Sequence, residues 1–278
     1  YFLDEYRAGR TPNPDVLCNR EIKFKAFLDH ALNLGADAIA TGHYAGVQQA
    51  GDHYQLVRAK DDNKDQTYFL YLLNQHQLSH ARFPLAEIDK SEVRRLARLA
   101  GLKTHDKRDS TGICFIGERR FRDFLSRYLP AQPGIIETPD GKKIGDHQGL
   151  MYYTIGQRQG LGIGGLKGSG DTPWFVAAKD LQRNVLIAVQ GKDHPLLFSR
   201  ALLARQTHWI AQQPAFPLRC LARCRHRQPL QACTVTRQEP GALHVAFDTP
   251  QRAVTPGQAV VFYQQQLCLG GATIEQAL

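Results

Sequence analysis

Cysteine is sparse in this sequence, and the six residues follow no pairing pattern. They stand at positions 18, 114, 220, 224, 233 and 268, which excludes the dense disulfide framework of a small secreted protein. Three residues separate Cys220 from Cys224 and no matching second pair follows, so the spacing of a structural zinc site is missing. We therefore expect reduced thiols, a cytoplasmic location and no metal bound by the protein itself.

Long apolar runs are also missing. No stretch approaches the roughly 20 apolar residues needed to cross a bilayer, and no basic amphipathic helix stands out as a membrane anchor, so we expect no membrane partner. The chain opens Tyr1-Phe2-Leu3-Asp4 without an initiator methionine or a signal peptide, which is typical of a piece that begins inside a helix.

The charge is one-sided. The 278 residues carry a formal net charge of +9, which favours a polyanionic partner, and nucleic acid is the better candidate since no membrane signal is present. A basic protein without such a partner remains the alternative. Hydrophobic residues at 42% and charged residues at 22% are typical of a globular protein, and this length predicts two or three domains.

The first part of the chain alternates helical and strand patterns. Apolar spacing predicts helices over 20–33, with Asn19 as N-cap, over 64–73, and over 89–100, where Asp89 and Glu92 resemble a capping box. A short strand over 36–41 lies between the first two. This alternation indicates a parallel α/β layer.

After a predicted helix at 118–129 the pattern changes to short strands. Residues 130–190 are rich in Gly and Pro, with strands predicted at 150–155, 174–178 and 185–189, and the last 80 residues or so predict a small barrel or sandwich, with strands at 218–226, 232–236, 243–247 and 259–263. We predict an α/β protein with three domains: a partial doubly wound catalytic domain at 1–118, a small mostly-β central domain at 119–197, and a C-terminal β-barrel at 198–278.

Two cysteines stand in segments suited to chemistry. Cys18 follows the stiff segment Thr11-Pro12-Asn13-Pro14-Asp15 and precedes the predicted helix, whose positive N-terminal end would stabilise a thiolate. A carboxylate three residues before the thiol suits covalent catalysis with a nearby proton acceptor. The alternative is a buried, inert cysteine.

Cys114 is followed by Glu118-Arg119-Arg120 at the start of a predicted helix. Arginines there oppose the helix dipole, which indicates contact with phosphate or support of a thiolate. An ordinary charge cluster beside a core cysteine is the alternative.

Three further patterns bear on binding. His43 follows a predicted strand, where open α/β sheets bind ligands, although a lone histidine is often structural. The segment 160–165 matches G-x-G-x-x-G, but Gly and Pro after it prevent the helix that a dinucleotide site needs. Arginines at odd positions of 219–227 predict a strand with a basic outer face and with Cys220 and Cys224 in the core.

Together, the strings resemble the bacterial tRNA-specific 2-thiouridylase family in order and spacing. They are T-P-N-P-D-V-L-C-N, A-T-G-H-Y, K-D-Q-T-Y-F-L, D-S-T-G-I-C-F-I-G, G-Q-R-Q-G-L-G-I-G-G and T-P-G-Q, and they extend over essentially the whole chain. The resemblance implies an adenine nucleotide alpha hydrolase-like catalytic fold and an enzyme that uses ATP, with Mg²⁺, to adenylate the C2 oxygen of the wobble uridine before sulfur replaces it.

The resemblance also implies roles for individual residues. Cys114 would carry a persulfide delivered by a sulfur-relay or cysteine desulfurase protein, and Cys18 would attack that persulfide, releasing sulfide or leaving a Cys18–Cys114 disulfide. Asp15 would be the general acid/base, and Gly42 would touch the nucleotide. Residues matching the tRNA-binding positions, the first three of which would line the target base, are Asn13, Pro14, Asp15, His43, Lys64, Asp65, Gln66, Arg225, His226 and Gln258.

One part of the family pattern is missing. The family carries an S-G-G-x-D-S phosphate loop near its N-terminus, and no such string occurs here. We therefore expect this polypeptide to lack most of its ATP site and to be inactive alone, and its first 120 residues to fold poorly. A non-catalytic RNA-binding module and a dithiol oxidoreductase remain rival hypotheses.

Overall fold

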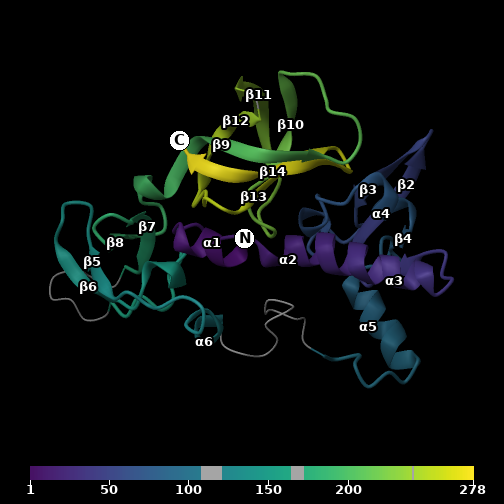
Figure 1. Ribbon diagram of the computed structural model, residues 1–278, viewed down its shortest axis with the longest axis horizontal. Helices are drawn as coiled ribbons and strands as arrows, with labels where there is room; N and C mark the ends of the chain where they lie inside the picture. Colours follow the sequence, from purple (N-terminus) through teal and green to yellow (C-terminus); the bar gives the residue numbers. More distant parts are fainter. Residues whose placement is uncertain (108–120, 164–171, 240) are drawn as a thin grey trace.

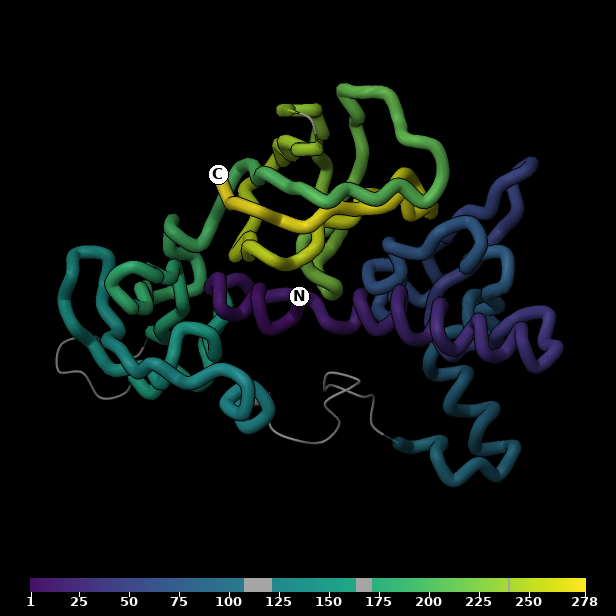
Figure 2. The backbone as a smooth tube through the Cα atoms, viewed as in Figure 1, coloured from purple at the N-terminus to yellow at the C-terminus, as the bar shows by residue number. Residues whose placement is uncertain are grey.

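A computed structural model of the chain describes residues 1–107, 121–163, 172–239 and 241–278. It has three parts: an N-terminal helical and mixed region, a small β-rich region, and a β-barrel that lies above a long helical segment (Figures 1 and 2). The β-rich region and the mixed region lie toward opposite ends of the molecule, and the barrel lies between them over the N-terminal helices (Figure 1).

The N-terminal helical segment differs from the predicted helix in where it begins. Helix α1 covers Phe2–Arg7, and α2 (Pro14–Leu17), the π-helix η1 (Cys18–Phe27) and α3 (Leu28–Asn33) run on without a break. Pro14 occupies the first helical turn, where its missing N–H costs nothing and its fixed φ suits a helix. The predicted N-cap at Asn19 is therefore wrong, because extended Asn13 is the N-cap and Asn19 is buried inside the helix.

The mixed region holds a short parallel pair and a hairpin. Strand β1 (Ile39–Ala40) pairs in parallel with β4 (Ala81–Arg82), as an α/β layer requires. Between them lie the hairpin β2 (Ala45–Ala50) and β3 (His53–Arg58), the 3-10 turn η2 (Thr67–Phe69) and helix α4 (Gln75–Ser79). Buried Phe24, Leu28, Leu56, Tyr68 and Leu78 join these elements in one core, so the described residues of this region pack around a common interior.

The predicted helix at 64–73 is wrong. The structure has only one 3-10 turn there, η2. The carboxylate of Asp65 accepts hydrogen bonds from the Thr67 N–H, 3.3 Å, and from the Thr67 hydroxyl, 2.9 Å. An aspartate that bonds its own local backbone offers an alternative to the helical hydrogen bonds.

Helix α5 (Lys90–Leu99) occurs where the pattern predicts it, but the capping box is absent. Asp89 is the N-cap without a side-chain cap bond; it pairs with Lys60 at 3.2 Å, and Glu92 pairs with Arg95. The helix has no buried residue among those described, and Leu96 on its predicted apolar face is 43% exposed. The side chains of Asp89 and Glu92 form ion pairs and do not cap the helix.

The central region is a four-stranded sheet with short helices. Its elements are α6 (Phe121–Leu125), β5 (Gly134–Glu137), β6 (Lys143–His147), η3 (Leu150–Tyr152), β7 (Trp174–Asp180), β8 (Val185–Gln190) and η4 (Pro195–Leu197). The strand order is β6-β5-β8-β7. The predicted strand at 150–155 is wrong, because η3 forms a tight turn there, whereas the strands beginning at 174 and 185 are confirmed.

The C-terminal region is a closed antiparallel barrel of six strands. They are β9 (Phe198–Trp209), β10 (Leu218–Arg223), β11 (Gln231–Glu239), β12 (Ala242–Arg252), β13 (Ala259–Gln264) and β14 (Leu267–Ala277). Strand β13 pairs with both β10 and β14, which closes the barrel. Strand β14 also pairs with β3, so the N-terminal hairpin extends the barrel sheet. The predicted fold class is confirmed.

The predicted basic face of 219–227 does not form. Arg219 is exposed and pairs with Asp248, but Arg223 is buried against Asp65 at 3.4 Å and lies over the Tyr263 ring. Arg223 is still in β10, on the face opposite Cys220 and Ala222. It is buried because the mixed region covers this outer side of the barrel there. The core positions of Cys220 and Cys224 are confirmed.

Candidate functional site

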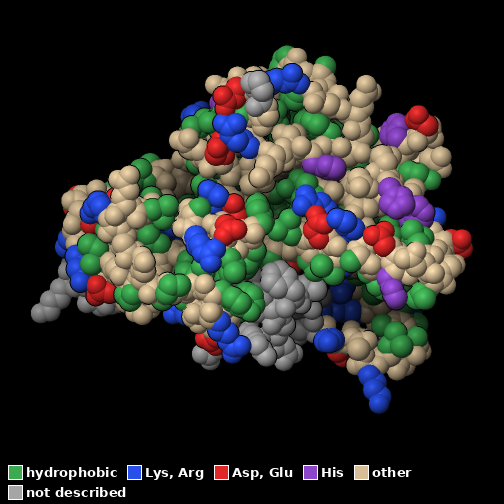
Figure 3. Space-filling model, in the orientation of Figure 1, with side chains coloured by type: hydrophobic (Ala, Val, Ile, Leu, Met, Phe, Trp, Pro, Cys, Tyr) green, Lys and Arg blue, Asp and Glu red, His purple; other side chains and the backbone are tan. Residues whose placement is uncertain are grey.

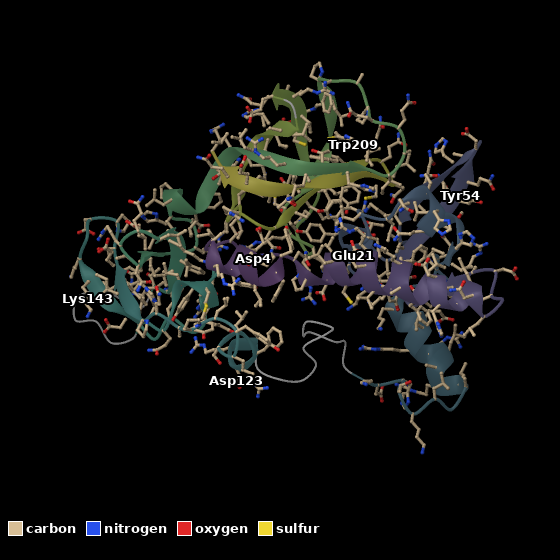
Figure 4. The ribbon with its side chains drawn as sticks, in the orientation of Figure 1. Asp4, Glu21, Tyr54, Asp123, Lys143 and Trp209 are labelled. Carbon is tan, nitrogen blue, oxygen red and sulfur yellow. The ribbon has the colours of Figure 1, made fainter. Side chains whose placement is uncertain are left out.

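The segment from Thr11 to Cys18 leads into the long helix beneath the barrel; Glu21, a turn further on, is marked in Figure 4. Asp15 lies in the first turn of α2 and Cys18 is the first residue of the π-helix η1. Residues three apart lie on the same side of a helix, so Asp15 and Cys18 share one side of it. Cys18 is a buried free thiol.

The sequence pattern predicted that Cys18 lies just before the helix N-terminus, and this prediction is wrong. The Cys18 backbone N–H already bonds to the Pro14 carbonyl, so the residue stands one turn inside the helix. The effect of the helix dipole falls off within the first turn. Support for a thiolate at Cys18 therefore depends on neighbouring side chains more than on the helix end.

The C-terminal barrel holds the segment that precedes this helix. Thr11 N–H donates to the Pro256 carbonyl at 3.0 Å. The Gln258 side-chain amide donates to the carbonyls of Thr11, 2.7 Å, and Pro12, 3.3 Å. T-P-N-P and T-P-G-Q, distant in sequence, are therefore in direct contact.

A cavity of about 750 Å³ opens beside this contact. Its wall is mainly apolar, with Asn13 and Cys18 on one side and Gly257 on the barrel side. The other lining residues are Tyr1, Phe2, Pro14, Val16, Leu17, Arg20, Glu21, Ile22, Tyr71, Leu72, Gln206, Ala259 and Thr273. An apolar hollow with a few polar groups is the usual form of a site for a planar organic group.

The loop after β1 places Gly42 and His43 together. Gly42 is exposed, and a Cβ built on it would meet nothing within 4 Å, so its backbone is open to a ligand. The Thr41 hydroxyl accepts from the His43 N–H, 3.3 Å, and lies 2.6 Å from His43 Nδ1, to which it can donate. The ring packs near Phe24 and Phe83. Burial, with a smaller contribution from Lys23, lowers the pKa of His43 to about 4, so the ring is neutral at pH 7.

The segment Lys64-Asp65-Gln66 supports this loop. Gln66 accepts from the Tyr44 N–H at 2.9 Å, and its own N–H donates to the Tyr44 carbonyl at 2.8 Å. The Asp65 carboxylate is fully buried between Arg58, 3.6 Å, and Arg223, 3.4 Å. In this structure Asp65 and Gln66 organise the loop, and Lys64 is the cation of the segment.

Arg225 and His226 contact other parts of the protein. The Arg225 guanidinium donates to the carbonyls of Ile155, 2.6 Å, and Ala253, 3.2 Å, which ties the central region to the barrel. Desolvation lowers the pKa of Arg225. His226 bonds to the Asp65 carbonyl at 2.9 Å and its ring lies 4.5 Å from that of Phe69, so His226 connects the barrel to the 64–66 segment.

Sequence reasoning missed Tyr68 and Asn19. The Tyr68 hydroxyl donates to the carbonyls of Cys224, 3.2 Å, and Ala259, 3.0 Å, while Asn19 donates to the Phe69 carbonyl at 3.1 Å. Asn19 thus joins the helix that carries Cys18 to the 64–70 segment, and Tyr68 joins that segment to the barrel. Tyr68 and Phe69 are adjacent in the string K-D-Q-T-Y-F-L, and this aromatic pair was the sequence signal that could have pointed to Tyr68.

Cys114 lies outside the described residues, as does the proposed disulfide with Cys18. Within the described ranges no group of three or more His, Cys, Asp or Glu could hold a metal ion, and no helix there is long and apolar enough to cross a membrane. On the face shown in Figure 3, Lys and Arg side chains are spread over all three regions.

Comparison with known proteins defines the class. The model for the tRNA methyl transferase HUP domain matches residues 1–118, that for the tRNA methyl transferase PRC-barrel domain matches 122–190, and that for the aminomethyltransferase beta-barrel domain matches 199–274. The chain is thus of the class in which a HUP domain is followed by a PRC-barrel and a second β-barrel.

Individual relatives are more specific. A tRNA-specific 2-thiouridylase MnmA of Alcanivorax borkumensis is 61% identical over 277 residues, covering 99% of this chain and 76% of the relative. The protein of the same name from Marinobacter nauticus is 62% identical over 280 residues, covering 99% of this chain and 71% of the relative. The chain belongs to the tRNA-specific 2-thiouridylase family.

Proposed function

We propose that this chain is a tRNA uridine 2-sulfurtransferase, which replaces the C2 oxygen of the wobble uridine with sulfur. The observation that carries the proposal is Cys18 on the wall of an apolar cavity, three residues after Asp15 in one helix, in a chain about 60% identical to named 2-thiouridylases. The cavity suits a flipped-out base, since enzymes that act on a base take it out of the stack.

The two cysteines divide the sulfur chemistry. Cys114 accepts a persulfide from a sulfur-relay or cysteine desulfurase protein, and its terminal sulfur bonds to C2. Cys18 then attacks the sulfur of Cys114, which leaves a Cys18–Cys114 disulfide, or attacks the persulfide earlier and liberates sulfide. Asp15 is the acid/base that exchanges protons with the thiol and the base. One thiol as carrier and a second to resolve the linkage is the minimum that such exchange needs.

The nucleotide and the tRNA bind around the same loops. ATP, with Mg²⁺, activates the C2 oxygen as a leaving group, and Gly42 fits a nucleotide contact because the space above its backbone is open. Asn13, Pro14 and Asp15 line the target base. His43, Lys64, Asp65, Gln66, Arg225, His226 and Gln258 form the tRNA-binding group. Asp65 and Gln258 belong to it through the loop and the segment that they hold, because their side chains already bond to the protein.

The test compares wild type with Cys18→Ser and Cys114→Ser. Each protein receives ATP, Mg²⁺, a persulfide donor and tRNA, and 2-thiouridine is detected by mass spectrometry. The assay uses this chain and also this chain joined at its N-terminus to a segment carrying an S-G-G-x-D-S loop. We expect thiolation only by the joined wild type, with each Ser variant reduced by about 10³-fold or more, as for loss of a catalytic nucleophile.

Cys220→Ser is the control, because Cys220 is a buried barrel residue far from the helix in sequence. Normal thiolation by both catalytic variants would disprove the two-cysteine mechanism and leave the RNA-binding module as the surviving hypothesis. Thiolation by this chain without the added segment would disprove the expectation that it is inactive alone.

A further inference from the structure

The Thr11–Pro14 segment cannot hold itself in place by its own hydrogen bonds. Pro12 and Pro14 have no N–H to donate, and the carbonyls of Thr11 and Pro12 need donors from elsewhere when they are buried. Both carbonyls receive the Gln258 side-chain amide, at 2.7 and 3.3 Å. The donor that satisfies the start of the Cys18 helix is therefore a barrel residue.

Gln258 is itself fixed to the barrel. Its N–H donates to the Thr255 carbonyl at 3.2 Å, and its carbonyl accepts from the Ile274 N–H at 2.8 Å. Gly257 precedes it with φ +89°, and a Cβ on Gly257 would lie 2.9 Å from the Thr11 nitrogen. The turn thus presses directly on the Thr11 backbone, which only a residue without a side chain permits.

We propose that Gln258 is a positioning residue: through the Thr11 and Pro12 carbonyls it fixes the helix start that carries Asp15 and Cys18. The C-terminal barrel then acts on the reaction by orienting the catalytic helix. The activity part of this proposal rests on the proposed 2-thiolation, whereas the structural part does not. It differs from a direct tRNA contact because the amide N–H groups of Gln258 are already used by the protein.

Gln258→Met tests the proposal, since Met matches Gln in length but cannot donate. Gln264→Met is the matched control, because Gln264 is exposed on the same strand, β13. Three properties are measured on this chain: hydrogen exchange of the peptide 11–18, the rate of Cys18 alkylation located by peptide mass spectrometry, and the Kd for tRNA. The turnover of thiolation is measured on the joined protein described above.

For Gln258→Met we expect exchange of 11–18 and alkylation of Cys18 to quicken about ten-fold, since losing the donor eases local opening. We expect turnover at saturating tRNA to fall about ten-fold or more, because small misplacements of reacting groups slow catalysis. The Kd should stay within about two-fold, since the phosphate contacts that dominate binding are unchanged. Gln264→Met should resemble wild type.

Unchanged exchange and alkylation in Gln258→Met would overturn the proposal, and so would a raised Kd with normal turnover, which would make Gln258 a tRNA contact only. Gln258→Glu gives a second route, because its carboxylate would face two carbonyls and should quicken exchange at least as much. A melting temperature close to that of wild type shows that either variant is folded. If wild type does not thiolate, the proposed function fails, while exchange and alkylation still decide the role of Gln258.

Discussion

At the scale of single residues, burial sets the charge of the histidines near the site. His43 has its pKa lowered to about 4, and desolvation also lowers the pKa values of His147, His208 and His226. The Nδ1 atom of the neutral His43 ring lies 2.6 Å from the Thr41 hydroxyl, and a neutral imidazole has one donor and one acceptor nitrogen. The ring can therefore form hydrogen bonds without adding a charge to the site.

This burial makes folding stability depend on pH. Because the folded pKa of His43 lies below the unfolded value of about 6.5, the contribution is complete above pH 6.5 and is lost as the pH falls toward 4. Urea unfolding measures the free energy of unfolding at pH 7 and at pH 5. From pH 7 to pH 5 this free energy should fall by on the order of 2 kcal/mol less in His43→Gln than in wild type. The exposed-surface control His53→Gln should lose as much as wild type, and equal losses in all three would contradict the assignment.

At the scale of elements, a buried ion-pair group joins the 64–66 segment to the barrel. Asp65 faces Arg58 of β3 and Arg223 of β10, and the Asp65 carbonyl receives His226. Strand β3, the 64–66 segment and the distant strand β10 therefore meet at one carboxylate. Two aspartates contact Arg58, since Asp62 also pairs with it at 2.7 Å but is 70% exposed.

These two aspartates give a matched prediction. Asp65→Asn leaves the buried Arg223 guanidinium without its charge partner and leaves Arg58 only the exposed Asp62, so it should destabilise the protein by about 3 kcal/mol. Asp62→Asn removes an exposed pair and should cost about 0.5 kcal/mol or less. Chemical denaturation measures both. Similar losses for the two variants would show that the buried group does not join the elements as described.

At the scale of the whole molecule, two features bear on the proposed function: the positive charge and the closure of the barrel. The chain has a net charge of +9, and Lys and Arg side chains lie over all three regions on the face in view (Figure 3), so phosphate contacts from several regions would add together. The closed barrel leaves no free strand edge between β13 and β14, while β3 extends β14 toward the mixed region. The barrel can thus serve as a rigid support for the helix beneath it.

The charge predicts strongly salt-dependent tRNA binding. Raising NaCl from 50 to 200 mM should raise the Kd at least about ten-fold. Each phosphate that the protein neutralises releases counterions, and this release is less favourable at higher salt. Fluorescence anisotropy with labelled tRNA measures this, and potassium glutamate at matched ionic strength controls for anion effects. An affinity that does not change with salt would contradict binding through phosphates.

The sequence alone determined the family and the fold class, because these reside in local strings and in periodicity. It predicted α5, β7 and β8, whose patterns are local. It did not predict the start of the Cys18 helix correctly, because it took the Pro-Asn-Pro segment as a loop when Pro14 belongs to the first turn.

Only the tertiary structure decided which groups meet. The bond of Gln258 to Thr11, the ion pair of Arg223 with Asp65 and the pairing of β3 with β14 each join segments far apart in the chain. Such contacts follow from closure of the barrel and from the need to satisfy buried carbonyls and charges, which act over the whole fold and leave no periodic trace in the sequence. The sequence contained the strings that predict thiol chemistry, whereas only the folded chain brings Gln258 of the barrel onto the segment that precedes Cys18.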